Sequence, residues 1–257
     1  MVTDMIFDSH AHYDDESFNE DRDYLLSEYL PSKGVTGIIN CASDFESIEK
    51  TIKLSEAYKY VYAALGIHPE CAARLPENWL EVLEEGLKRE KTVSLGEIGL
   101  DYYWEDSCPR DIQKEVFRKQ LELAKKYDIP VIIHDRDAHG DTLEILKEFK
   151  PKGVVHCFSG SVEMAREVIK LGMYIGMGGV VTFKNARHSV EVMSDIPLDK
   201  LLLETDAPYL SPVPMRGKRN DSSYIPYAAA KIGQLRNLSA TEILEISRNN
   251  IKTLFGV

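Results

Sequence analysis

The stretch TVSLGEIGLD, residues 92–101, is an apolar run of strand length that contains one glutamate, Glu97. Its apolar residues are nearly continuous, which is typical of a parallel strand buried on both faces. Similar runs recur along the chain, and polar and helical sequence lies between them. They are MIFDSH (5–10), GVTGIINCA (34–42), YVYAALGIH (60–68), IPVIIHD (129–135), GVVHCF (153–158), MYIGMGG (173–179) and KLLLETD (200–206).

Eight strands that alternate with helices predict an α/β fold, and a length near 250 residues favours a (β/α)8 TIM barrel. We therefore predict a single domain over residues 1–257. A doubly wound open sheet is the alternative, but no GxGxxG follows the first strand. The hydrophobic fraction of 44% is that of an ordinary globular protein.

Three helices carry clear sequence signals. Residues 161–172 begin with an N-capping serine and end with a glycine. Residues 111–126 place Ile112 and Val116 on one apolar face. Residues 239–255 open with a Ser-x-x-Glu capping box.

Charge and cysteine content restrict the location and the partners. The net charge of -11 argues against a broad basic face that coats nucleic acid, although it allows a local phosphate site. Four cysteines without a CxxC indicate reduced thiols. No segment reaches the ~20 apolar residues of a membrane span, and no signal peptide is evident. We expect a cytoplasmic protein without a membrane or a stable protein partner.

Several polar side chains stand at the ends of the predicted strands, where the mouth of a barrel lies. His10 and His12 share a strand face, because residues i and i+2 point the same way. A lone histidine at a strand end is more often structural, but five of the seven histidines fall at strand ends. The candidate metal ligands are His10, His12, Glu97, His134, His156 and Asp206.

This set contains nitrogen and oxygen donors without thiolate, which suits Zn, Mn, Co, Ni or Mg. Six ligands are too many for one tetrahedral ion and suit two divalent ions with a bridging carboxylate. Two-metal sites stabilise the attacking and leaving oxygens of a phosphodiester and generate the nucleophile from water.

The chain resembles the TatD family of metal-dependent deoxyribonucleases over essentially its whole length. The segments that carry the resemblance are FDSHAHYDD, GIHPE, GEIGLDYYW, PVIIHDRDA, HCFSGS, GGVVTFKNA, LLLETDAPYL and RGKRN. The resemblance implies two ion sites that share Glu97, one with His10, His12 and Asp206, the other with His134 and His156. Many related amidohydrolases use a carboxylated lysine as the bridge, but the run SLGEIGL has no lysine.

Four further side chains are candidates for holding substrate. His68 would contact a phosphate or a leaving group, with a structural role as the alternative. Arg136 could pair with phosphate. Arg216 and Lys218 lie in the loop after the last strand, a common place for phosphate sites in barrels, although such a charge run is otherwise a solvated loop. The rings of DYYW could stack on bases or pack in the core.

Our hypothesis is phosphodiester hydrolysis by a deoxyribonuclease that acts 3′ to 5′ on single-stranded DNA ends. An acidic chain suits a strand end better than a long duplex, and the resemblance points the same way. Asp206 would orient the water or take its proton, Glu97 would bridge the ions, and Glu204 would support a ligand. Hydrolysis of another ester, such as D-aminoacyl-tRNA, is the alternative. A non-catalytic binding protein has no reason to retain all six ligands.

Five other residues near these segments are assigned less firmly. Asp14 and Asp15 fall beyond the first strand and are assigned to its loop. Asp8 could support a histidine or face the barrel interior. Asp135 and Met215 depart from the usual family pattern, which leaves substrate preference open.

Overall fold

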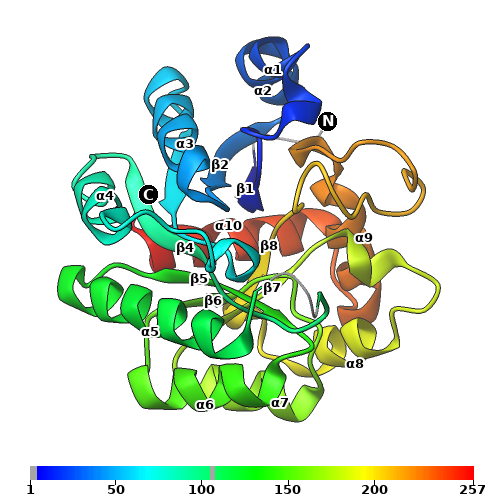
Figure 1. Ribbon diagram of the computed structural model, residues 1–257. Helices are drawn as coiled ribbons and strands as arrows, with labels where there is room; N and C mark the ends of the chain where they lie inside the picture. The colour runs from blue at the N-terminus through cyan, green and yellow to red at the C-terminus, as the bar shows by residue number, and fades with distance from the viewer. Residues whose placement is uncertain (1–4, 105–107) are drawn as a thin grey trace.

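The structure is a computed structural model that describes residues 5–104 and 108–257. Eight parallel strands form one sheet in sequential order, and the sheet curls into a barrel (Figure 1). The strands are β1 (Ile6–Ala11), β2 (Val35–Cys41), β3 (Val61–Leu65), β4 (Thr92–Asp101), β5 (Val131–Arg136), β6 (Gly153–Val155), β7 (Tyr174–Met177) and β8 (Leu201–Leu203). The predicted strands and the single-domain (β/α)8 fold are confirmed.

The helices lie outside the strands, and α10 packs against β1 and β8 (Figure 1). The α-helices are α1 (Arg22–Tyr24), α2 (Leu30–Ser32), α3 (Phe45–Ala57), α4 (Trp79–Gly86), α5 (Arg110–Tyr127), α6 (His139–Phe149), α7 (Val162–Lys170), α8 (Arg187–Asp195), α9 (Ile225–Arg236) and α10 (Ala240–Phe255). The π-helical turn is η2 (Leu25–Tyr29), and the 3-10 turns are η1 (Glu16–Phe18), η3 (Pro69–Cys71), η4 (Gly179–Thr182), η5 (Leu198–Lys200) and η6 (Ser222–Tyr224). None of the helices in the described part of the chain is both long and apolar enough to cross a bilayer.

The barrel closes between β8 and β1 through one isolated bridge, from Ala11 to Ala207. β8 has only three residues and offers few backbone groups for a ladder. The buried carboxylate of Asp8 adds to the closure, because it accepts hydrogen bonds from the N–H and the hydroxyl of Thr205 at 3.0 and 2.5 Å. Its bond to His10 comes from the backbone N–H. Asp8 therefore joins the two ends of the sheet.

Two hydrophobic clusters occupy the two sides of the sheet. Ile38 belongs to the larger cluster, which includes helix residues such as Leu83. Its neighbour Ile39 belongs to the smaller cluster, which includes Ile132 of β5 and Phe255 of α10. Adjacent strand residues point to opposite faces, so each strand needs an almost unbroken apolar sequence. The polar residues are therefore concentrated at the strand ends.

The predicted helix caps are confirmed. The hydroxyl of Ser161 accepts a hydrogen bond from the N–H of Met164 at the start of α7. Ser239 and Glu242 form the reciprocal bonds of a capping box at the start of α10. These local hydrogen bonds satisfy backbone donors that a helix leaves open at its first turn.

The predicted apolar face of α5 is confirmed at Val116, which is buried, and is wrong at Ile112, which is 37% exposed. The buried face instead includes Gln113 and Gln120. The Gln113 amide accepts from the N–H of Asp101 at 2.8 Å and donates to its carbonyl oxygen at 2.8 Å. Hydrophobic periodicity cannot reveal that this face contains buried glutamines, because their burial depends on hydrogen bonds with backbone groups.

Gly99 of β4 lies against the backbone of β5. It has φ +145°, and a Cβ atom there would lie 2.0 Å from the carbonyl oxygen of His134. We predict that Gly99→Ala lowers the free energy of unfolding by about 3 kcal/mol, because the backbone must distort or the two strands must separate. Urea denaturation monitored by circular dichroism measures this change in the free energy of unfolding.

Gly140→Ala is the matched control. A Cβ atom at Gly140 in α6 meets no described atom within 4 Å, and alanine favours a helix by about 0.5–1 kcal/mol. Equal stability of the Gly99→Ala variant and the wild type would contradict the strand contact.

Candidate metal centre

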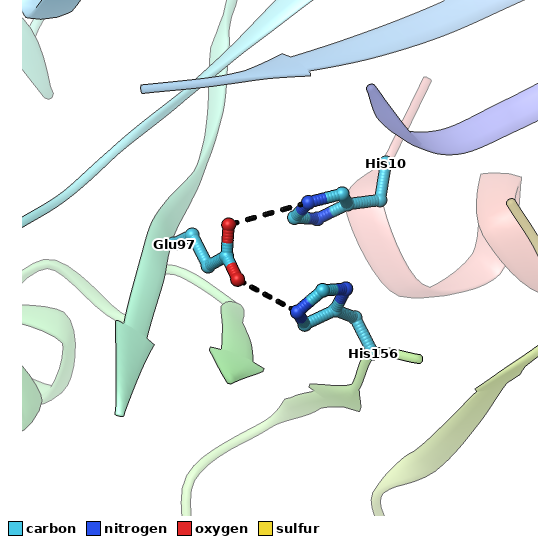
Figure 2. Close-up of side chains that lie close together, drawn as sticks. All are labelled: His10, Glu97 and His156. Atoms are coloured by element: carbon cyan, nitrogen blue, oxygen red, sulfur yellow. Dashed lines mark ion pairs between the residues drawn. The ribbon is translucent and has the colours of Figure 1, made fainter. Parts of the chain in front are cut away.

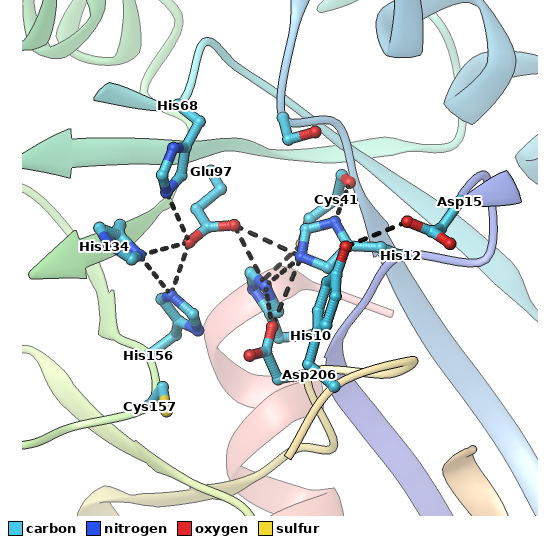
Figure 3. Close-up of polar contacts among 12 residues, drawn as sticks. His10, His12, Asp15, Cys41, His68, Glu97, His134, His156, Cys157 and Asp206 are labelled. Carbon is cyan, nitrogen blue, oxygen red and sulfur yellow. Dashed lines mark hydrogen bonds and ion pairs between the residues drawn. The ribbon is translucent and has the colours of Figure 1, made fainter. Parts of the chain in front are cut away.

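Six side chains predicted to bind metal converge at the C-terminal ends of the strands (Figure 3). They come from the end of β1 (His10, His12), β4 (Glu97), β5 (His134), the residue after β6 (His156) and the loop after β8 (Asp206). All are largely buried, and the side chain of Asp206 is 18% exposed. The barrel order brings together residues that lie far apart in the sequence.

Four atoms form a first donor group, namely Nε2 of His10, Nε2 of His12, Oε2 of Glu97 and Oδ1 of Asp206. Nε2 of His10 lies 3.3 Å from the Glu97 oxygen and 3.4 Å from the Asp206 oxygen. The corresponding distances from Nε2 of His12 are 3.4 and 3.5 Å, and the two nitrogens are 3.0 Å apart. Ligand atoms placed tetrahedrally about 2.0–2.2 Å from an ion lie roughly 3.3–3.6 Å apart, so this group fits a divalent cation.

Three atoms form a second donor group around the other oxygen of Glu97. Its Oε1 lies 2.7 Å from Nδ1 of His134 and 2.7 Å from Nε2 of His156. The two nitrogens are 3.3 Å apart. In Figure 2 one oxygen of Glu97 faces His10 and the other faces His156. The two donor groups are therefore joined by a single carboxylate.

The other ring nitrogens of two histidines are held by acceptors. Nδ1 of His12 lies 2.8 Å from the carbonyl oxygen of Cys41, and Nε2 of His134 lies 3.0 Å from Oδ2 of Asp101. These oxygens can only accept, so the nitrogens facing them carry the protons. When these rings are neutral, the opposite nitrogens turn lone pairs into the two donor groups, which is the arrangement that metal-binding histidines adopt.

Glu204 lies behind His156, outside the second donor group. Its Oε1 is 3.7 Å from Nδ1 of His156 and accepts a hydrogen bond from the N–H of Cys157 at 2.5 Å. Among the described residues, Nδ1 of His156 and Oε2 of Glu204 are the buried side-chain polar atoms without a hydrogen-bond partner. A Cβ atom at Gly176 would lie 2.5 Å from this Oε2, so the glycine leaves space for the carboxylate.

The charges of the cluster are balanced within it. Burial would raise the pKa of Glu97, but His156 and His10 hold it well below its usual range. Burial likewise opposes ionisation of Asp206, yet hydrogen bonds from two histidines keep its pKa low. Burial lowers the pKa of His134, but its two carboxylate partners outweigh this and raise the value to about 9. A cation that binds here must displace protons from histidine.

Two predicted substrate contacts lie at or beside the cluster. Nε2 of His68 is 3.8 Å from Oε1 of Glu97, and its ring centroid is 4.3 Å from that of His134. Arg136 ends β5 two residues after His134, and its guanidinium lies 3.8 Å from the ring centroid of Tyr103. His68 therefore lies beside the second donor group, and Arg136 lies on the same strand as His134 with its guanidinium against Tyr103.

The structure does not bring the other two predicted contacts to the cluster. Arg216 lies 4.1 Å from the ring centroid of Phe183 and donates to the carbonyl oxygen of Ser211. Lys218 is exposed. The third cation of this loop, Arg219, pairs with Asp21. The cations of the loop after β8 therefore contact neighbouring surface segments or solvent, and not the donor groups.

The less firmly assigned acids lie outside both donor groups. Asp15 accepts from the N–H of Ser17 at 2.8 Å and caps η1. Asp14 accepts from the side chain of Asn40 at 2.8 Å. Asp135 faces α6, where it lies 2.7 Å from Nδ1 of His139. Asp14 and Asp15 are in the loop after β1, as the sequence predicts.

Comparison with known proteins agrees with the fold and shows the family to which the chain belongs. The family model for TatD related DNase matches residues 7–256. The chain belongs to the TatD family. It is 44% identical to the uncharacterized metal-dependent hydrolase YabD of Bacillus subtilis over 98% of this chain and 100% of that protein. The crystal structure of the TatD homologue YjjV from Escherichia coli matches with a TM-score of 0.92 and 36% identity, covering 100% of both chains.

Asp101 contacts the second donor group, and this contact was not predicted from the sequence. It lies four residues after Glu97 on the same strand, so both side chains face the same way. Oδ2 lies 3.0 Å from Nε2 of His134, and Oδ1 accepts from the N–H of Tyr103 at 2.9 Å. The i, i+4 spacing of Glu97 and Asp101 on one strand was the available signal.

We predict that Asp101→Asn weakens metal binding by about tenfold, because loss of the negative charge makes His134 a weaker metal ligand. Isothermal titration calorimetry with Mn²⁺ measures the affinity and the number of ions bound. Asp141→Asn is the control, because Asp141 accepts from Tyr102 and Lys114. Unchanged affinities in the Asp101→Asn variant would show that Asp101 does not position His134.

Proposed function

We propose that this TatD family chain is a divalent-metal-dependent phosphodiesterase that removes nucleotides from the 3′ ends of single-stranded DNA. The observation that supports this most is the position of Glu97, whose two oxygens each face a different donor group. The proposal assigns two ions, one to each donor group. It also assigns a supporting role to Glu204, behind His156.

Bound ions would supply Lewis acidity at the phosphate and lower the pKa of the attacking water. Asp206 is the partly exposed acid of the cluster, and its backbone has the left-handed φ of +60°. An ionised carboxylate at this point can accept a hydrogen bond from water and take its proton. Glu97 holds the two donor groups at a constant separation.

In the proposed phosphodiesterase, His68 would donate a hydrogen bond to the substrate. Its Nδ1 accepts a hydrogen bond from the N–H of Glu70 at 3.3 Å, so Nε2 carries the proton and faces Glu97. Burial, and then the charge of His134, lower the pKa of His68 to about 3. A neutral imidazole with Nε2–H directed into the site can bond a phosphate oxygen but has no lone pair for a metal there.

We predict that His68→Ala lowers kcat/KM on single-stranded DNA about 10- to 100-fold, the loss of a hydrogen bond to a charged group. His68→Gln retains an N–H donor and should recover most of this loss. Elemental analysis should find the same metal content in both variants and in the wild type. Loss of an ion from His68→Ala would instead make this histidine a ligand.

An activity screen tests the proposed function. The protein, with Mg²⁺ or Mn²⁺ and with EDTA as control, is given end-labelled single-stranded DNA, duplex DNA, RNA and D-aminoacyl-tRNA. We expect mononucleotides to be released from the 3′ end of single-stranded DNA only with metal. Turnover of aminoacyl-tRNA alone would establish the deacylase alternative, and turnover of none would favour a binding protein.

A further inference from the structure

Two aromatic rings and a guanidinium lie together beside the second donor group. Tyr103 is 50% exposed and Trp104 is 51% exposed, and their ring centroids are 4.7 Å apart at an interplanar angle of 89°. The guanidinium of Arg136 lies 3.8 Å from the centroid of Tyr103 and 5.7 Å from that of Trp104. We call these three residues the aromatic platform.

The aromatic platform is attached to the candidate metal centre through short contacts. The carboxylate of Asp101 accepts from the N–H of Tyr103 with one oxygen and contacts Nε2 of His134 with the other. On the other side, the N–H of Tyr102 donates to the carbonyl oxygen of Arg136 at 2.9 Å. The backbone of Tyr103 and the His134 side chain of the second donor group are therefore joined through the carboxylate of Asp101.

The chemistry of the aromatic platform matches one nucleotide. Exposed ring faces stack on nucleobases, and the planar guanidinium of arginine pairs with phosphate and stacks on aromatic rings. Arg136 forms no ion pair with any residue in 5–104 or 108–257, so its charge is not neutralised by a carboxylate of the described chain. In a chain of net charge -11, an arginine that lies over an exposed ring favours an anionic, aromatic ligand.

We propose that the aromatic platform binds the nucleotide next to the scissile phosphate, with its phosphate on Arg136. Because the two rings lie at 89° to each other, its base stacks on one ring and makes an edge contact with the other. This inference rests on the proposed function, because it names the part of the nucleic acid that the same site recognises. A base must be unstacked from its neighbours to reach the rings. The aromatic platform thus selects single-stranded ends over duplex DNA and over phosphodiesters without a base.

Hydrolysis of two matched octanucleotides tests this subsite. One is oligo(dT), and the other carries base-free residues at its 3′ end with the same phosphates. We expect Trp104→Ala and Tyr103→Ala to lower kcat/KM on oligo(dT) roughly tenfold, and by less than twofold on the base-free oligonucleotide. Equal losses on both substrates, or no loss on either, would overturn the proposal. Tyr24→Ala is the control, since Tyr24 is 54% exposed and contacts Tyr29.

Tryptophan fluorescence separates this inference from the proposed function. The chain has two tryptophans, and Trp79 is only 8% exposed. Phosphorothioate versions of both octanucleotides, which resist hydrolysis, are titrated into the Mg²⁺-loaded protein and into Trp104→Phe. We expect quenching by oligo(dT) that is lost in the variant and with the base-free probe. If the protein shows this quenching but hydrolyses no DNA, the aromatic platform is supported and the nuclease proposal is refuted. If oligo(dT) causes no quenching, the aromatic platform does not bind a base and this inference is overturned.

Discussion

Alanine in place of Glu97 is expected to remove both bound ions and to lower the rate of DNA hydrolysis by roughly 10³-fold or more, because several kcal/mol of charge stabilisation depend on the ions. Glu97 is the only residue with an oxygen in each donor group. Without it the second group retains only His134 and His156. Metal content by elemental analysis and single-turnover hydrolysis of end-labelled DNA measure the two effects.

Glu70→Ala is the control for Glu97→Ala. Glu70 is a partly buried acid close to the site, and the hydrogen bond to His68 comes from its backbone N–H, which alanine retains. It should retain two ions and most of the activity. Hydrolysis that survived unchanged in Glu97→Ala would refute the metal mechanism, and two ions retained there would refute the bridging role.

Asp206→Asn is expected to lower kcat by about 10²- to 10⁴-fold, the range of general acid–base catalysis, while much of the metal remains bound. Asparagine preserves the shape of the side chain and an oxygen donor beside His10 and His12, but it cannot take a proton from water. Pre-steady-state kinetics on metal-saturated protein separates loss of chemistry from loss of metal.

Asp15→Asn is a suitable control for this substitution. Asp15 lies in the loop after β1 and accepts from Ser17 and from the hydroxyl of Tyr209. Its substitution should leave kcat within about twofold. If Asp206→Asn retained kcat within a factor of ten with both ions bound, Asp206 would not be the proton acceptor.

The strands were predictable because the sheet is buried on both faces. A residue such as Ile38 faces the helices while Ile39 faces the barrel interior, so each strand is apolar throughout and is visible in the sequence. The residues that close the sheet were not predictable. Asp8 adds to the backbone bridge between the two ends of the sheet, and nothing local to Asp8 indicates that Thr205 is its partner.

The convergence of the six candidate ligands was predictable from topology, since parallel strand ends meet at one mouth. The distances within the donor groups were not, because they depend on rotamers and on groups behind the ligands. The carbonyl oxygen of Cys41 orients His12, and Asp101 orients His134. Neither contact has a local sequence pattern that names its histidine.

The positions of the loop cations could not be predicted from the sequence. Arg216 and Lys218 follow the last strand, as phosphate-binding residues often do, but the structure stacks Arg216 on Phe183. The direction of a side chain in a loop depends on tertiary packing, and the spacing of charged residues in the sequence does not predict it. Arg136 is different, because it lies on a strand whose direction is determined by the sheet.

We propose that Glu97 bridges two ions, one in each donor group. Anomalous scattering from crystals of the Mn²⁺-loaded protein measures this directly. We predict two peaks roughly 3.5–4 Å apart, one among the atoms of the first donor group and one among those of the second. A single peak, or two peaks of which only one lies next to a Glu97 oxygen, would contradict the account.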